Sequence, residues 1–177
     1  MKRIGFFGGC FNPPNTLHIE IANNLIKEGK LDKVVFVPVN NYYKKQGLID
    51  EKHRYNMLKL AIKDYKNLEV DDIEIKESRI LYAVDAFEII KNSSFINRDD
   101  KDEVYFIMGS DNFIKMPMWK DYNKIKDKYK YIIIDRNKND ITSTKIREMI
   151  YRDDEDVKEF LNKDVYEYIV SNQLYKL

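Results

Sequence analysis

Short apolar runs alternate along this chain with longer stretches whose apolar residues recur at helical spacing. The runs predict buried strands at residues 4–7, 34–37, 68–75, 104–108 and 131–134, the third being the weakest. The other stretches predict helices at residues 18–30, 54–63, 82–91, 122–128, 144–151 and 165–172. Because strands without polar alternation are buried on both faces, this order is typical of a parallel sheet. We therefore expect a Rossmann-like α/β fold, a doubly wound parallel sheet with helices on both faces.

Size and charge narrow the class of protein. A chain of 177 residues suits one hydrophobic core, and no repeat or linker divides it, so we expect a single domain over residues 1–177. Its 31 basic and 30 acidic side chains nearly cancel, which argues against a nucleic acid as partner. No apolar stretch suits a membrane span or a secretory signal, and the one cysteine, Cys10, excludes a disulfide framework. We expect a cytoplasmic protein without a membrane partner.

The loop after the first expected strand combines several features of a phosphate site. Gly8 and Gly9 end the strand and let backbone amides approach a ligand closely. Phe11 begins a stiff Phe-Asn-Pro-Pro segment, and the helix start that follows offers amides and a positive dipole end to an anion. His18, in the first turn of that helix, can donate to a phosphate oxygen and stabilise charge on a transferred group. The alternative is a rigid turn with a solvated histidine, and the combination of features favours phosphate binding.

Residues 141–147 form a second candidate phosphate site. Thr142 and Ser143 place hydroxyls at an expected helix start, and the guanidinium of Arg147 can bind a polyphosphate. The first turn of this helix is basic, which opposes the helix dipole unless an anion binds there. Taken alone, the segment favours a simpler interpretation, a plain helix cap with solvated charges.

Both segments resemble the signatures of the pyridine-nucleotide adenylyltransferases, members of the nucleotidyltransferase superfamily. The first signature, Gly-x-Phe-Asn/Asp-Pro followed by His- or Thr-x-x-His, reads GCFNPPNTLH at residues 9–18. The second, Ile-Ser-Ser-Thr-x-Ile-Arg, reads ITSTKIR at residues 141–147. Further landmarks of the family follow in order at residues 43–48, 53–54, 109–112, 119–120 and 165–175. The resemblance spans nearly the whole chain and implies a fold of the nucleotidyltransferase type.

The resemblance also implies a reaction. AMP would move from ATP to the phosphate of nicotinate mononucleotide, giving deamido-NAD and pyrophosphate in NAD biosynthesis. Mg²⁺ would arrive with ATP, held mainly by the triphosphate, so no metal ligand is assigned to the protein. Such catalysis depends on positioning and charge stabilisation, without a covalent intermediate. The expected partners are ATP and a pyridine mononucleotide, and the sequence leaves open whether the chain forms a homo-oligomer.

Matching the family residue by residue assigns roles to individual side chains. His18 matches the histidine that contacts the reacting phosphate, and Arg147 belongs to the triphosphate clamp. The match places at the ATP and phosphate site Gly8, Gly9, Phe11, Thr16, Gly109, Asp111, Ile141, Thr142 and Ser143. It places at the mononucleotide site Tyr43, Lys44, Lys45, Tyr82, Asp85 and Trp119. In this match the ring of Trp119 stacks on the pyridine, although a tryptophan at the edge of the core is the alternative.

The sequence departs from the family pattern beside both substrates. Asn15 stands where the family usually has His or Thr. Its amide can still donate to a phosphate oxygen, so we assign it a catalytic role, with Thr16 as an alternative donor one position later. Ala83 and Ala86 replace threonines of the family beside the pyridine.

Three hypotheses are open. The first is an adenylyltransferase that prefers nicotinate mononucleotide, although no residue decides between this acceptor, nicotinamide mononucleotide and dual acceptance. The second is transfer to another acceptor, such as a pantetheine or polyol phosphate, against which Trp119 and the segment beginning at Tyr43 argue. The third is a nucleotide-binding protein that lost turnover through Asn15, against which His18 and Arg147 argue.

Overall fold

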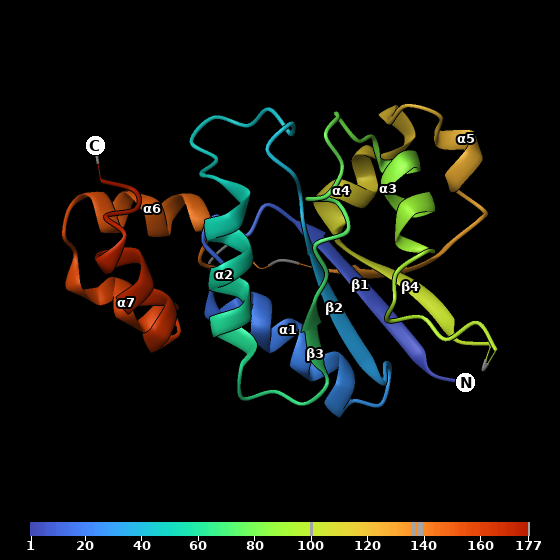
Figure 1. Cartoon of the computed structure of the whole chain (residues 1–177), viewed down its shortest axis with the longest axis horizontal. Helices are drawn as coiled ribbons and strands as arrows, with labels where there is room; N and C mark the ends of the chain where they lie inside the picture. The colour runs from blue at the N-terminus through green and yellow to red at the C-terminus, as the bar shows by residue number, and fades with distance from the viewer. Residues whose placement is uncertain (100, 136, 138–139, 177) are drawn as a thin grey trace.

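Five strands form one wholly parallel sheet in the computed structural model, which describes residues 1–99, 101–135, 137 and 140–176. The strand order is β3-β2-β1-β4-β5, so the first strand of the chain lies at the centre (Figure 1). The chain winds outward to one edge and then, through β4, outward to the other, which confirms the doubly wound sheet. The strands are β1 Arg3–Gly9, β2 Lys33–Pro38, β3 Leu68–Val70, β4 Glu103–Gly109 and β5 Lys130–Ile134.

Helices cover both faces of the sheet, as expected. The α-helices are α1 Thr16–Lys27, α2 Glu51–Ile62, α3 Ala83–Ile90, α4 Ser110–Lys115, α5 Tyr122–Ile125, α6 Ser143–Tyr151 and α7 Lys163–Ser171. Two 3₁₀ turns are η1 Met116–Met118 and η2 Glu155–Phe160. Among the described residues, none of these helices is long and apolar enough to cross a bilayer.

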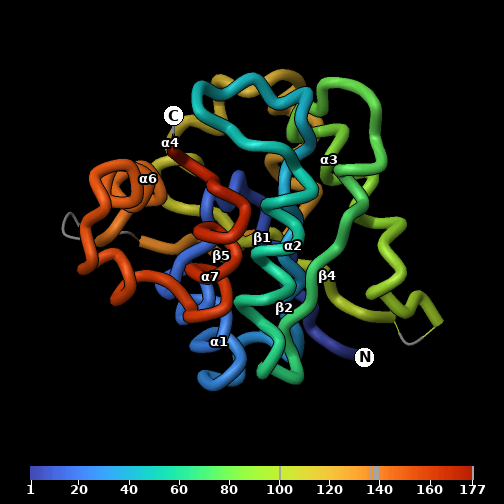
Figure 2. The backbone as a smooth tube through the Cα atoms, turned by 60° about the vertical axis from the view of Figure 1, so that its left-hand side comes forward, coloured from blue at the N-terminus to red at the C-terminus, as the bar shows by residue number. Residues whose placement is uncertain are grey.

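Neighbouring side chains of one strand enter different cores. In β1, Phe6 packs into the cluster that includes α3 and α5, whereas Phe7 packs into the cluster that includes α1, α2, α6 and α7. This follows from the two-residue period of a strand, which sends successive side chains to opposite faces. Figures 1 and 2 show the two termini at opposite ends of the molecule, with the C-terminal end beside α6.

Several element boundaries differ from the predictions. The strand expected at 68–75 ends at Val70, because the carboxylate of Asp71 accepts a hydrogen bond from the N–H of Ile73 (3.1 Å) and turns the chain. The helix expected at 122–128 ends at Ile125. The first helix begins two residues early, at Thr16. Helix α4 was not predicted, because it buries none of its residues and so carries no apolar stripe.

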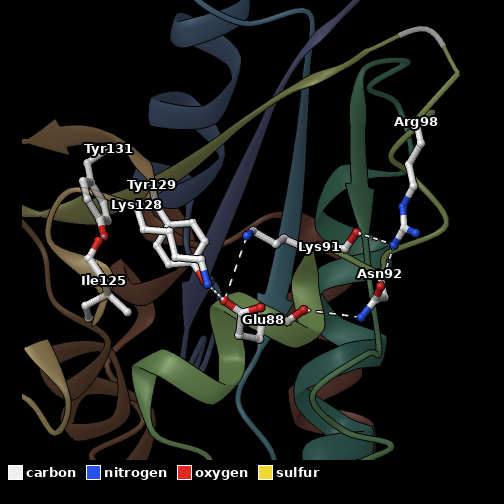
Figure 3. Close-up of polar contacts among 8 residues, drawn as sticks. All are labelled: Glu88, Lys91, Asn92, Arg98, Ile125, Lys128, Tyr129 and Tyr131. Atoms are coloured by element: carbon white, nitrogen blue, oxygen red, sulfur yellow. Dashed lines mark hydrogen bonds and ion pairs between the residues drawn. The ribbon is translucent and has the colours of Figure 1, made fainter. Parts of the chain in front are cut away.

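A cluster of polar contacts fastens α3 to the segment around β5. The carboxylate of Glu88 on α3 accepts hydrogen bonds from Lys128 and from the hydroxyl of Tyr129 (Figure 3). The hydroxyl of Tyr131 in β5 donates to the carbonyl of Ile125 in α5 at 2.6 Å. These contacts fix α3 and α5 over the same face of the sheet, and α3 lines the cavity described below.

Candidate active site

A cavity of about 1140 Å³ opens at the carboxyl edge of the sheet, bordered by the ends of β1 and β4 and the starts of α1, α3 and α6. Open parallel α/β sheets bind their ligands at this edge. Pockets for one small molecule commonly measure about 300–1,000 Å³, so this cavity has room for a large or a second substrate. The expected site residues that line it are Gly8, Gly9, Phe11, Asn15, His18, Tyr43, Lys45, Tyr82, Asp111, Trp119, Ile141, Thr142, Ser143 and Arg147.

Four expected site residues are not among those that line the cavity, namely Thr16, Lys44, Asp85 and Gly109. The carboxylate of Asp85 accepts from the N–H of Tyr82 (3.1 Å) and lies 3.6 Å from the guanidinium of Arg79. It therefore holds the start of α3 and the turn before it. Gly109 is the residue that precedes α4, and Thr16 is the first residue of α1. The substrate contacts assigned to these four residues, like those assigned to the residues that line the cavity, stay predictions.

Phe11 has a φ of +46°, a backbone conformation that residues other than glycine rarely adopt. Such a conformation costs about 1–3 kcal/mol and persists only where the surroundings enforce it. Here the ring is buried, with its centroid 5.8 Å from that of Phe7 and 5.4 Å from that of Phe36. The same ring lies edge-on to His18 at 5.2 Å. The packing of Phe11 thus supports the imidazole that we expect at the phosphate.

Asn15 and His18 bond to each other across the first turn of α1. The side-chain oxygen of Asn15 accepts from the N–H of His18 (3.1 Å), and Nδ1 of His18 accepts from the N–H of Asn15 (3.1 Å). Asn15 is therefore the N-cap of α1, and the residue is only 3% exposed. Because Nδ1 accepts a bond, the neutral imidazole carries its proton on Nε2, where it can donate.

The two signature segments are hydrogen-bonded to each other although they lie about 130 residues apart. The hydroxyl of Ser143 donates to the carbonyl of Pro13 (2.9 Å), and Nη1 of Arg147 donates to the carbonyl of Asn12 (2.8 Å). Thr142 caps α6 by accepting from the N–H of Lys145 (3.1 Å), and its hydroxyl proton can still be donated. The N-termini of α1 and α6 thus meet at one cavity, an arrangement that favours a bound anion.

Asn12 joins the first segment to the loop between β2 and α2. The residue is 4% exposed, and its side chain donates to the carbonyl of Gly47 (2.7 Å) and accepts from the N–H of Ile49 (3.4 Å). The ammonium of Lys45 lies 4.0 Å from the sulfur of Cys10 in the same segment. The sequence prediction placed Asn12 in the signature but gave it no function. The feature of the sequence that could have indicated a structural role for Asn12 is a polar side chain in an otherwise apolar stretch.

Arg54 and Glu74 are buried charged residues that the site prediction omitted. Arg54 is fully buried and donates to the carbonyls of Cys10, Val39 and Ile49 at 3.0, 2.6 and 3.0 Å. Glu74 lines the cavity and is 7% exposed, and burial raises its pKa to about 7 against the opposing effect of Arg54. Glu74 gave no signal because it falls in the range expected to be a strand.

Two aromatic rings and a lysine lie together in the cavity wall beside the start of α3 and the segment after η1. Tyr82 and Trp119 line the cavity, and the ammonium of Lys120 lies 4.3 Å from the centre of the Tyr82 ring. Flat rings of this kind stack on heteroaromatic ligands, and a cation beside them adds affinity for an anionic substituent. The prediction included both rings and omitted Lys120, although it directly follows the single tryptophan.

The donors around the signature segments suit phosphate oxygens. They are backbone amides at two helix starts, hydroxyls of Thr142 and Ser143, and the cationic side chains of Lys45 and Arg147. In the described part of the chain, no three His, Cys, Asp or Glu side chains lie together as a metal site requires. Such a donor set suits the oxygens of a triphosphate.

Comparisons with known proteins agree with this geometry. The sequence model of the cytidylyltransferase-like family matches residues 6–149. A relative from Endomicrobium trichonymphae, named probable nicotinate-nucleotide adenylyltransferase, is 30% identical over 200 residues, covering 99% of this chain and 100% of the relative. A relative of the same name from Clostridium acetobutylicum is 31% identical over 206 residues, covering 99% and 100%.

A solved structure shares the fold at lower sequence identity. Nicotinic acid mononucleotide adenylyltransferase from Plasmodium falciparum, complexed with NaAD, superposes with a TM-score of 0.77 at 20% identity. The match covers 99% of this chain and 98% of that one. Because the matches with the curated relatives run nearly end to end, the chain belongs to the cytidylyltransferase-like family and, within it, to the nicotinate-nucleotide adenylyltransferases.

Proposed function

We propose that this protein transfers AMP from ATP to nicotinate mononucleotide, forming deamido-NAD and pyrophosphate in NAD biosynthesis. The observation that carries the proposal is the contact between the two segments predicted to bind phosphate, made by Ser143 and Arg147 with the backbone of residues 12–13. The names of the relatives, and the NaAD in the Plasmodium falciparum structure, support the choice of substrates. The reaction uses intracellular metabolites, so we place the protein in the cytoplasm.

In the proposed mechanism the phosphate of the mononucleotide attacks the α-phosphorus of ATP. A bond forms between an acceptor oxygen and the α-phosphorus, and the bond from that phosphorus to the bridging β-phosphate oxygen breaks, releasing pyrophosphate. Nε2–H of His18, the amide of Asn15 and the guanidinium of Arg147 stabilise the charge on the phosphates. Mg²⁺ would enter with ATP and would offset part of the charge of the triphosphate.

The remaining lining residues divide between the two substrates. The backbone at Gly8 and Gly9, the hydroxyls of Thr142 and Ser143, and Asp111 are proposed to hold ATP. The mononucleotide is proposed to lie in the part of the cavity lined by Tyr43, Lys45, Tyr82 and Trp119, with its pyridine on Trp119. Lys120, beside these rings, adds positive charge that favours the carboxylate of nicotinate over the neutral amide of nicotinamide.

A direct assay tests the proposal. The protein is incubated with Mg-ATP and with nicotinate mononucleotide, nicotinamide mononucleotide, phosphopantetheine or a polyol phosphate in separate reactions, and dinucleotide and pyrophosphate are measured. We expect the highest kcat/KM with nicotinate mononucleotide. ATP binding without dinucleotide from either pyridine nucleotide would refute the proposal. Product with another acceptor would then identify a related transferase, and no product at all would indicate a binding protein.

A further inference from the structure

Through one hydroxyl, the segment after α7 reaches back to the loop between β1 and α1, residues 10–15, which we call the phosphate loop for its proposed role. Tyr175 donates from its hydroxyl to the side-chain oxygen of Asn12 at 2.9 Å, across 163 residues of sequence. In Figures 1 and 2 this end of the chain lies beside α6, the helix that carries Arg147. Burial raises the pKa of the Tyr175 hydroxyl well above its usual value, while the charges of Arg147 and Arg54 act in the opposite direction. The hydroxyl therefore stays protonated and remains a donor throughout the physiological pH range.

The side chain of Asn12 depends on this bond for its orientation. Its oxygen accepts from Tyr175 at 2.9 Å and, at a longer 3.4 Å, from the N–H of Ile49. Its nitrogen donates to the carbonyl of Gly47 at 2.7 Å. If the tyrosine hydroxyl is removed, the oxygen of Asn12 keeps only the longer of its two bonds. The amide then holds the loop at Gly47 less firmly.

Two phosphate-binding cations depend on the position of Asn12. The backbone carbonyl of Asn12 accepts from Arg147 at 2.8 Å, so a shift of residue 12 moves the guanidinium. Lys45 lies two residues before Gly47, in the loop that the Asn12 side chain holds. Gly47 has φ of +72°, so its backbone can take a turn that other residues strain to adopt. Asn12 thus connects the phosphate loop, the loop before α2, helix α6 and the C-terminal segment.

We propose that Tyr175 is a positioning residue, which orients Arg147 and Lys45 for the triphosphate by fixing Asn12. It touches no substrate itself and does not line the cavity. The kinetic consequence rests on the proposed adenylyl transfer, whereas the consequence for ATP binding does not. Misplacing charged groups at a reacting phosphate by a fraction of an ångström lowers turnover strongly, because the stabilisation depends on preorganised geometry.

Tyr168 offers a matched control in the same C-terminal region. Its hydroxyl lies 2.9 Å from Nδ1 of His53 and accepts from the side-chain nitrogen of Asn56 at 3.1 Å. These bonds link α7 to α2 and do not involve the phosphate loop. Tyr168→Phe therefore removes a tertiary hydroxyl contact of similar size without touching the proposed connection.

The test compares Tyr175→Phe and Tyr168→Phe with the wild type in three measurements: kcat for deamido-NAD formation, the Kd of a non-hydrolysable Mg-ATP analogue, and Tm. We expect Tyr175→Phe to lower kcat about tenfold and to weaken analogue binding about threefold. Tyr168→Phe should leave both within about twofold of the wild type. Since phenylalanine keeps the ring, Tm should fall by a similar small amount in both variants.

A double-mutant cycle with Asn12→Ala separates a specific connection from general loosening. In the Asn12→Ala background, adding Tyr175→Phe should change neither kcat nor analogue Kd further, because the hydroxyl no longer has its partner. Additive losses in the double variant would overturn the inference, and so would wild-type kcat and analogue affinity in Tyr175→Phe or in Asn12→Ala alone. A wild-type protein that binds the analogue and makes no dinucleotide would refute the proposed function, and the analogue Kd values would still decide the role of Tyr175.

Discussion

At the scale of single residues, neighbouring groups fix both the orientation and the tautomer of the His18 imidazole. Its Nδ1 accepts from the backbone of Asn15, and its ring packs edge-on against Phe11. Both contacts fix the ring and keep its proton on Nε2, the atom proposed to donate to the phosphate.

His18→Ala should lower kcat about 10²–10³-fold, because a preorganised donor to the transferred phosphate is lost. Tm should fall only modestly, because the residue is partly buried and the variant loses its bond from the N–H of Asn15. The other histidine of the chain, His53, bonds to Tyr168 between α2 and α7, so His53→Ala should lower Tm and leave kcat nearly unchanged. Steady-state kinetics and thermal melts of both variants check this. Near-normal kcat in His18→Ala would exclude its catalytic role.

Acceptor choice is expected to depend on Lys120. Lys120→Met removes the cation above Tyr82 and should lower kcat/KM for nicotinate mononucleotide about 3–10-fold, with a smaller change for nicotinamide mononucleotide. Lys124→Met, which removes a lysine paired with Asp121 at 3.1 Å, is the control for loss of one surface charge. The readout is the ratio of the two kcat/KM values. An unchanged ratio in Lys120→Met would assign acceptor choice to other groups.

At the scale of elements, the first turn of helix α1 holds His18, and a side chain of the same segment caps that turn. Asn15 supplies that cap, so one residue is proposed to serve both stability and catalysis. Asn15→Ala should lower the free energy of unfolding by about 1 kcal/mol, whereas Asn15→Ser keeps a capping oxygen and should lower it much less. Urea unfolding of both variants measures this difference.

The serine variant also isolates the proposed contact of the Asn15 amide with phosphate. It retains the cap but lacks the longer amide donor, so kcat should fall in Asn15→Ser although stability is nearly kept. Wild-type kcat in this variant would limit Asn15 to capping α1.

The elements could be predicted where local pattern decides them. The strands β1, β2, β4 and β5 are apolar runs, and all four pair in the sheet as predicted. At the edge of the sheet, β5 is only half-buried, whereas the sequence predicted a buried strand. The end of β3 could not be predicted from periodicity, because it depends on the side chain of Asp71. Helix α4 is formed by residues without an apolar stripe, so only its position after β4 specifies it.

At the scale of the whole molecule, residues of the candidate site could be predicted where a local motif contains them, and could not where long-range contacts place them. His18 and Arg147 belong to local motifs and could be identified from them. The bond from Tyr175 to Asn12 spans 163 residues and has no local pattern. Glu74 reaches the cavity through a turn after β3 that was expected to be part of the strand.

Glu74 makes the stability of the whole fold depend on pH. Burial raises its pKa from the usual 4.5 to about 7, so between these values the folded protein holds a proton that the unfolded chain has lost. The stabilisation from this proton is fully present below about pH 4.5 and is lost as the pH rises to about 7. The loss amounts to about 3 kcal/mol.

Glu74→Gln removes this titration. The free energy of unfolding of the variant, minus that of the wild type, should therefore be larger at pH 8 than at pH 5. Urea unfolding at both pH values measures the change, and Glu159→Gln, at an exposed position of η2, controls for loss of one carboxylate. A stability difference from wild type that is the same at both pH values would contradict the assignment.

The central place of β1 also has a consequence for synthesis on the ribosome. Its partners are β2, which ends at Pro38, and β4, which begins at Glu103. At translation rates of about 5–20 residues per second, several seconds separate the emergence of these two partners. During that interval one side of β1 presents unpaired backbone groups, the kind of edge on which other chains add strands. We expect the nascent chain to be a substrate for chaperones until β4 has left the ribosome.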